Sequence, residues 1–156
     1  MKNSFQIRLN RYFFTKVLIA ANPAYDPAGN RFGSHVTNQI SISRPEENPS
    51  SYFGEVRVSV LLDEGENPPY EIDVGVFGVV DVIGEGEEET ISKAAQIILT
   101  QTLYGATREM VQIITSRGPW PGFVVPILPP ADPEPKKPPT VASKKPGMAP
   151  RKPSNR

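Results

Sequence analysis

The chain has no cysteine and only one histidine among its 156 residues. Without cysteine neither a disulfide framework nor a thiolate metal site can form, which fits a reducing, cytoplasmic compartment. A Ser-His-Asp catalytic arrangement would depend on His35 alone, and a Cys-His arrangement is impossible without cysteine. The glycine pair Gly84 and Gly86 is not followed by Lys-Ser/Thr, so it is not a phosphate-binding loop. These absences predict a protein that is not an enzyme and that needs no cofactor.

Long hydrophobic runs are also missing. No stretch approaches the roughly 20 apolar residues that span a bilayer, so we expect no membrane insertion. The apolar residues 12–21 suggest a secretory signal, but Lys16 divides them into two short halves, which argues against that interpretation. The acids Glu85 and Glu87 to Glu89 lack the alternating ligand pattern of a calcium loop, and a solvated helix start is favoured over a metal site.

Proline is abundant and unevenly placed. Of 18 prolines, seven lie in residues 131–156, together with seven Lys or Arg and two acids, so this segment carries +5 and the remainder −5. Such a composition cannot bury a core. We therefore predict one domain over residues 1–130 and a basic, proline-rich, disordered tail over residues 131–156. The tail has no aromatic residue to stack on bases, which predicts no specific nucleic-acid binding.

Alternating apolar residues predict four strands. The first covers residues 5–19, with Phe5, Ile7, Leu9, Phe13, Val17 and Ile19 on the buried face and a bulge or bend near residues 10–13. The second covers residues 36–43, with Ile40 and Ile42 opposite polar side chains. The third buries Val56, Val58, Val60 and Leu62, and the fourth buries Tyr70, Ile72, Val74 and Val76. Short connections favour one antiparallel sheet, apolar on one face.

From Glu87 the period becomes helical. Glu87 to Glu89 suit the positive end of a helix dipole, and Thr90 is a candidate cap. Gly105 weakens the middle and suggests a kink or a join between two helices, and Gly118-Pro119 ends the helix. The expected apolar face comprises Ile91, Ala94, Ala95, Ile98, Leu99, Leu103, Ala106, Met110, Ile113 and Ile114.

The segment from Trp120 to Leu128 is apolar and extended, because Pro121 and Pro126 prevent a regular helix. Two interpretations remain. The segment belongs to the core and covers the sheet, or part of it stays accessible as a groove for extended apolar peptide, since an exposed apolar patch commonly marks a binding site.

The order of these features resembles the SecB family of export chaperones. The resemblance covers residues 5–130 and rests on Phe5-Gln6-Ile7, Asn22-Pro23, Leu103-Tyr104-Gly105-Ala106-Thr107-Arg108-Glu109, Ser116-Arg117-Gly118 and Val125-Pro126-Ile127. It implies an α+β fold, with a four-stranded antiparallel sheet and a long C-terminal helix, assembled as a homotetramer that is a dimer of dimers. It also implies apolar grooves that hold unfolded polypeptide without nucleotide.

The resemblance places site residues as well. Ile40 and Ile42 match groove positions, and we add Val124, Ile127 and Leu128 as expected contacts of the client. Family members that dock on the motor SecA carry acids on the outer sheet face. Asp73 matches one of these positions, whereas Val17 and Ala21 occupy two others without being acidic, so docking on SecA is doubtful.

The sequence therefore predicts an ATP-independent holdase for unfolded polypeptides or preproteins, serving protein export or one dedicated client such as an antitoxin. The rival hypothesis is a structural or scaffolding protein, phage-borne for example, that keeps the SecB-like fold with its groove filled.

Overall fold

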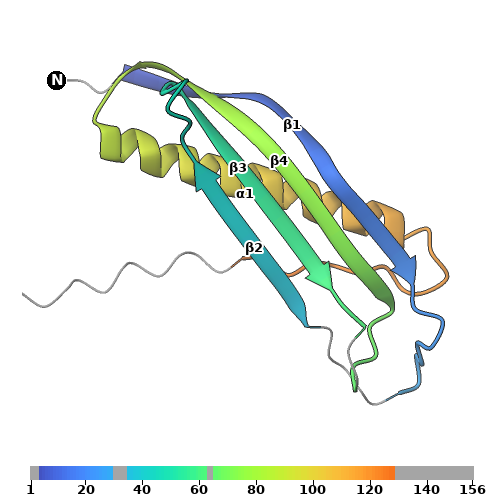
Figure 1. Ribbon diagram of the computed structural model, residues 1–156. Helices are drawn as coiled ribbons and strands as arrows, with labels where there is room; N and C mark the ends of the chain where they lie inside the picture. The colour runs from blue at the N-terminus through green and yellow to red at the C-terminus, as the bar shows by residue number, and fades with distance from the viewer. Residues whose placement is uncertain (1–3, 30–34, 63–64, 129–156) are drawn as a thin grey trace, which may run out of the picture.

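The computed structural model describes residues 4–29, 35–62 and 65–128. Its elements are the strands β1 (Ser4–Ala21), β2 (Val36–Ser43), β3 (Ser51–Val60) and β4 (Tyr70–Glu85) and the helix α1 (Glu88–Thr115). The strands form one antiparallel sheet in the order β1-β4-β3-β2, and α1 lies across one face of it (Figure 1). The predicted α+β class and the four strands are confirmed. Residues 131–156 lie outside the described parts, so their disorder stays a prediction.

The core lies between α1 and the two central strands. Val56, Val58, Ile72, Val74 and Val76 are fully buried, because every second side chain of β3 and β4 points toward the helix. Leu62, expected at the end of this series, lies beyond β3 and is 46% exposed. That prediction was wrong, because the strand ends at Val60 and the alternation of the sequence continues into the following loop.

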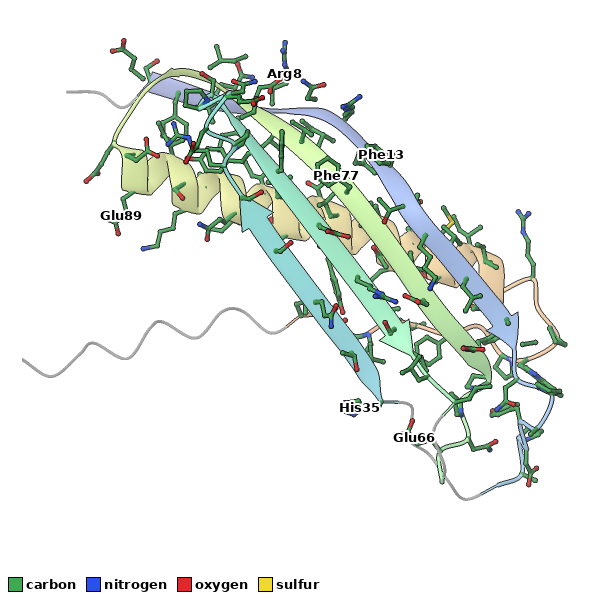
Figure 2. All side chains as sticks on the ribbon, viewed as in Figure 1. Arg8, Phe13, His35, Glu66, Phe77 and Glu89 are labelled. Atoms are coloured by element: carbon green, nitrogen blue, oxygen red, sulfur yellow. The ribbon has the colours of Figure 1, made fainter. Side chains whose placement is uncertain are left out.

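Two register shifts change which side chains of β1 face the helix. They fall between Leu9 and Arg11 and between Phe14 and Lys16, so a bulge occurs close to where the sequence predicts one. Directly paired side chains of an antiparallel sheet point to the same face. Phe13 pairs with Phe77 on the outer face, with ring centroids 5.5 Å apart (Figure 2). The prediction that Phe13 is buried was therefore wrong.

Helix α1 is continuous from Glu88 to Thr115, so the expected break at Gly105 is wrong. Thr90 does not cap it either: Glu87 holds the cap position, and Thr90 lies within the first turn. The buried face includes Tyr104, Thr107 and Thr115, which periodicity did not select. Each threonine hydroxyl donates to the carbonyl four residues earlier, which satisfies it in the core. No helix in the described parts of the chain is long and apolar enough to cross a membrane.

A pair of glycines sets how closely α1 approaches the sheet. Gly54 of β3 pairs with Gly78 of β4, and Leu103 of α1 fits over both. A Cβ at Gly78 would lie 2.6 Å from a methyl carbon of Leu103, and one at Gly54 would lie 3.2 Å from another. Leu103 is fully buried in this glycine notch, so the notch fixes the height and rotation of the helix.

Candidate functional site

After α1 the chain turns back and runs along the helix. The Phe123 N–H donates to Thr115 Oγ1 (2.9 Å), Arg108 Nε donates to the Val125 carbonyl (2.9 Å), and the Tyr104 hydroxyl donates to the Pro126 carbonyl (2.7 Å). The helical partners fall in the order 115, 108, 104. Residues 123–128 therefore lie antiparallel to α1, and we call them the return segment.

Aromatic residues hold the turn that precedes the return segment. The Trp120 indole N–H donates to the Asn22 carbonyl (3.0 Å), and the ring of Tyr25 meets Trp120 edge-on at 5.2 Å. The Trp120 N–H donates to the Tyr70 hydroxyl oxygen (3.2 Å). These contacts tie the turn after α1 to the loop after β1 and to Tyr70 of β4. The turn held in this way directs the chain back along the helix.

Part of this segment belongs to the core, as one interpretation expects, and part of it is accessible. Val125 is fully buried in the core, whereas Val124 is 60% exposed and Ile127 is 77% exposed. Leu128 is partly buried against the core. An extended chain presents alternate side chains to opposite sides, which accounts for the buried Val125 between the exposed Val124 and Pro126. The alternation does not continue to Ile127, which is exposed although it lies two residues after Val125.

A groove of about 630 Å³ lies between α1, the edge strand β2 and the return segment. Its floor is the side of α1 from Gln96 to Arg108, and its walls are Ile40 on one side and Ile127 with Leu128 on the other. At a rise of 1.5 Å per residue the floor is roughly 18 Å long. Extended polypeptide rises about 3.3 Å per residue, so the floor is as long as about five residues of extended chain.

The groove is mainly apolar with a few polar groups. Ile40 is 39% exposed and Ile97 is 53% exposed, and Thr100 and Gln101 offer hydrogen-bonding groups beside them. Burial raises the pKa of the Tyr104 hydroxyl, which keeps this group neutral as a donor to the return segment. Such an arrangement can bind an extended apolar chain.

The structure brings together three of the five predicted groove residues, Ile40, Ile127 and Leu128. Ile42 lies on the same face of β2 but is partly buried against the core, and Val124 does not line the groove. Sequence reasoning missed Ile97, Tyr104 and Arg108. Their spacing of seven and four residues marks a second helical stripe beside the apolar face, and this signal could have found them.

Asp73 lies on the outer sheet face but is not free to meet a partner. It is 6% exposed, accepts two hydrogen bonds from Arg57 at 2.7 Å and pairs with Lys16. The Arg57 guanidinium, aided by Lys16, lowers the pKa of Asp73 to about 2. The carboxylate is therefore charged at neutral pH and already compensated within the sheet.

The expected outer-face positions on β1 need correction. Val17 pairs with Val74 and Ala21 pairs with Tyr70, and both partners point toward the helix. The second register shift of β1 causes the difference. Lys16, Leu18 and Ala20 occupy the outer face near Asp73, and none of them is acidic.

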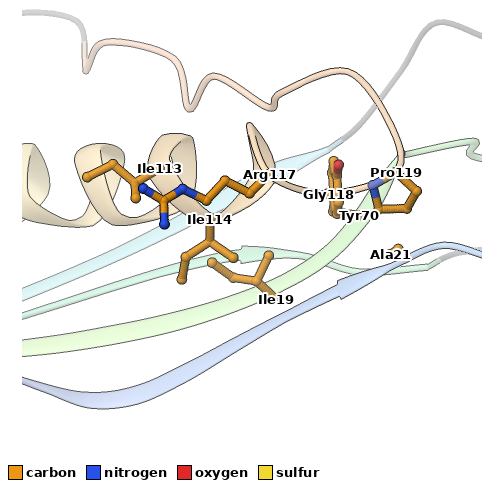
Figure 3. Close-up of a pocket in the computed structure, with 8 residues that line it drawn as sticks. All are labelled: Ile19, Ala21, Tyr70, Ile113, Ile114, Arg117, Gly118 and Pro119. Carbon is orange, nitrogen blue, oxygen red and sulfur yellow. The ribbon is translucent and has the colours of Figure 1, made fainter.

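A smaller cavity of about 410 Å³ lies near the other end of α1 (Figure 3). Ile113 and Ile114 of the helix, Ile19 of β1 and the Gly118–Pro119 turn line it. Ile113 is 48% exposed and Ile114 is 36% exposed, although both were expected to face the core. Val17, on the helix side of β1, is also 45% exposed. This side of the helix therefore has an uncovered apolar surface.

His35 does not line the groove. It is exposed at the start of β2, and its backbone N–H donates to Glu66 (3.3 Å; Figure 2). Within the described residues, no group of three or more His, Asp or Glu side chains could hold a metal ion.

No family model matches the chain, and no curated protein matches it. Among solved structures, it resembles the Mycobacterium tuberculosis Rv1957 SecB-like chaperone in complex with a ChAD peptide from the Rv1956 HigA1 antitoxin. The TM-score is 0.60 at 16% identity, over 80% of this chain and 91% of that one. It also resembles a Streptococcus agalactiae protein of unknown function, with a TM-score of 0.50 at 11% identity, over 80% and 99% of the two chains.

These likenesses define the class of fold. The chain has the architecture of a SecB-like protein, a four-stranded antiparallel sheet with one long helix. At such low identity the comparison shows the fold alone, and it supports the SecB resemblance found in the sequence.

Proposed function

We propose that the protein is an ATP-independent chaperone of the cytoplasm that holds unfolded polypeptides in an apolar groove and performs no chemistry on them. The observation that carries this proposal is the groove formed by α1, Ile40 and the end of the return segment, Ile127 and Leu128. Burying apolar side chains of a client there is favourable by about 25 cal/mol per Å². Affinity would follow buried apolar area, which suits a holdase with varied clients.

The finer proposal concerns which clients are held. The neighbour from M. tuberculosis has a peptide of an antitoxin bound, which supports one dedicated client of that kind for this chain. General export is the other variant, and it requires docking on SecA. The neutralised Asp73 and the lack of outer-face acids near it on β1 favour the dedicated client.

The scaffolding alternative assumes that the groove is filled. Within the described residues the groove is open, and Ile127 exposes more than three quarters of its surface. Ile127 adjoins the other exposed apolar side chains of the groove, Ile40 and Ile97, and a contiguous exposed apolar patch commonly marks a binding site. The open groove therefore favours the chaperone over the scaffold.

We also propose that the chain assembles as a dimer of dimers. Ile91 and Leu99, on the apolar face that the sequence predicts for the helix, are buried within the chain itself. Ile113, Ile114 and Val17 on the open side of α1 remain exposed and suit a subunit contact. Sedimentation equilibrium should show a tetramer at micromolar concentration, and a monomer would contradict the assembly.

The test of the function is suppression of aggregation of a slowly folding client without ATP. Ile40→Asp and Ile127→Asp should weaken protection, because each places a charge in a groove wall that removes apolar surface from water. Leu62→Asp is the matched control, since Leu62 is a similarly exposed residue outside the groove. Ile42 is unsuitable because it packs on the core.

Circular dichroism and sedimentation must show that each variant folds and assembles like the wild type. If the groove variants protect as well as the Leu62→Asp control, the groove is not the client site. If the wild type protects no client, including those recovered by pull-down from the native cell, the scaffolding hypothesis becomes the better one.

A further inference from the structure

Among the described residues that line the groove, Arg108 alone carries a charge. It is half-buried, and its Nε is used by the Val125 carbonyl. No described residue accepts a hydrogen bond from its two terminal nitrogens or forms an ion pair with it. Arg8, Arg44 and Arg57, in contrast, each pair with an acid. Arg108 therefore places a positive charge in the groove, and its two terminal nitrogens are available to donate hydrogen bonds to a ligand.

An uncompensated guanidinium at an apolar surface favours a particular kind of ligand. Arginine presents paired N–H donors in a plane, which matches the two oxygens of a carboxylate. The surrounding apolar side chains reduce screening by water, so the pair is stronger there than on an open surface. A neutral client would leave these donors partly desolvated and unpaired, which is unfavourable.

We propose that Arg108 binds an acidic side chain of the bound polypeptide. Arg108 would then be a determinant of client specificity. This inference rests on the proposed holdase function and adds a sequence preference to it. The groove would select an extended segment that has an apolar residue at one end and an aspartate or glutamate at the other.

The geometry sets the spacing of the two features. Ile97 and Arg108 are eleven residues apart on one helix, which corresponds to roughly 16 Å along its axis. An extended chain covers that distance in about five residues. An apolar side chain against Ile40 and Ile97 would therefore place an acid about five residues away beside Arg108.

Synthetic peptides of about twelve residues test this preference. Each carries one leucine and, about five residues before or after it, either glutamate or its neutral twin glutamine in a Ser/Gln background. All are capped at both ends and labelled with fluorescein for anisotropy measurements on the full-length chain. At physiological salt the glutamate peptide of one polarity should bind about three- to tenfold more tightly than its twin. The difference should shrink as salt is raised.

Two arginine variants locate the effect. Arg108→Gln should abolish the glutamate preference, while Arg117→Gln should keep it, because Arg117 lies at the second cavity rather than in the groove. The comparison of twin peptides on the wild type needs no variant, so the test does not depend on the folding of Arg108→Gln.

Several results would overturn the proposal. Equal affinity of the twins in both polarities is one, and a glutamate preference that survives Arg108→Gln is another. A gain seen only with a free C-terminal carboxylate would assign the ligand to chain ends. If the preference for glutamate emerges only after removal of residues 131–156, then Asp132 or Glu134 of the same chain pairs with Arg108 instead of an acid of the client. If leucine-to-serine peptides bind as well as the originals, the holdase function itself fails.

Discussion

Shortening Val125 should open the groove without touching any residue that lines it. Val125 is the fully buried residue of the return segment, and it lies between the exposed Val124 and the proline that precedes Ile127. Val125→Ala removes two methyl groups from the core. We expect the sheet and α1 to remain folded while Ile127 and Leu128 lose their fixed place beside the helix.

The magnitude follows from burial. Two buried methyl groups account for about 1.6 kcal/mol of transfer free energy, and the cavity left behind raises the loss to about 2–3 kcal/mol. The hydrogen bonds from Tyr104 and Arg108 to the return segment contribute about 1 kcal/mol each. Ordering each backbone residue costs about 1–2 kcal/mol. The two hydrogen bonds alone therefore cannot keep the segment docked.

Two measurements follow the effect. Anisotropy with a labelled apolar peptide should show about five- to tenfold weaker binding by Val125→Ala, which corresponds to about 1.0–1.4 kcal/mol. Urea unfolding should show lower stability. Val124→Ala is the matched control, because it makes the same chemical change one residue away at a site that is 60% exposed. It should change neither quantity measurably.

One outcome would refute this reasoning directly. If Val125→Ala is destabilised but binds peptide as tightly as the wild type, the return segment is not a wall of the groove. If Val124→Ala loses as much affinity as Val125→Ala, the client contacts the exposed side of the segment, as the sequence analysis expected of Val124.

Three other predictions concern the rest of the molecule. Because the pKa of Asp73 is lowered to about 2 from 3.8, its ion pairs stabilise the fold fully above about pH 4. About 1–2 kcal/mol should be lost toward pH 2, and urea unfolding of Asp73→Asn should lack that loss. Truncation after Pro130 should leave the melting temperature within about 2 °C, since every described core residue precedes it; a larger drop would show that the tail supports the fold. SecA should bind only weakly at physiological salt, and sub-micromolar affinity in calorimetry that survives the truncation would contradict this.

The strands were predictable because their alternation is strong, and β2 has the predicted bounds. The face of β1 was predicted outside the two register shifts but not between them, because each shift moves the following side chains to the other face. Phe13 lies on the outer face, whereas Val17 and Ile19, beyond the second shift, lie on the helix side as predicted. A sequence can suggest a bulge near Asn10, but it does not reveal a second one near Thr15. The helix was found but not its full buried face, since Thr107 and Thr115 are buried through bonds to their own backbone.

The groove was predicted in part for a similar reason. Ile40 and Ile127 follow from exposed apolar positions and from the family resemblance. The choice between Val124 and Val125 depends on which side of an extended segment meets the core, and two adjacent valines cannot decide it. Tyr104 and Arg108 were missed because their role comes from carbonyls that lie about twenty residues later in the chain.

The glycine notch has a consequence for how this binding surface can change during evolution. Successive residues of a helix are separated by about 100° around its axis, so a small rotation of α1 would exchange the residues that face the groove. Leu103, seated between Gly54 and Gly78, resists that rotation. A single methyl added at Gly78 would push on Leu103 and turn its neighbour Tyr104 relative to β2. Substitutions at these two glycines would therefore change which side chains line the groove, although the substituted positions lie beneath the helix and outside the groove.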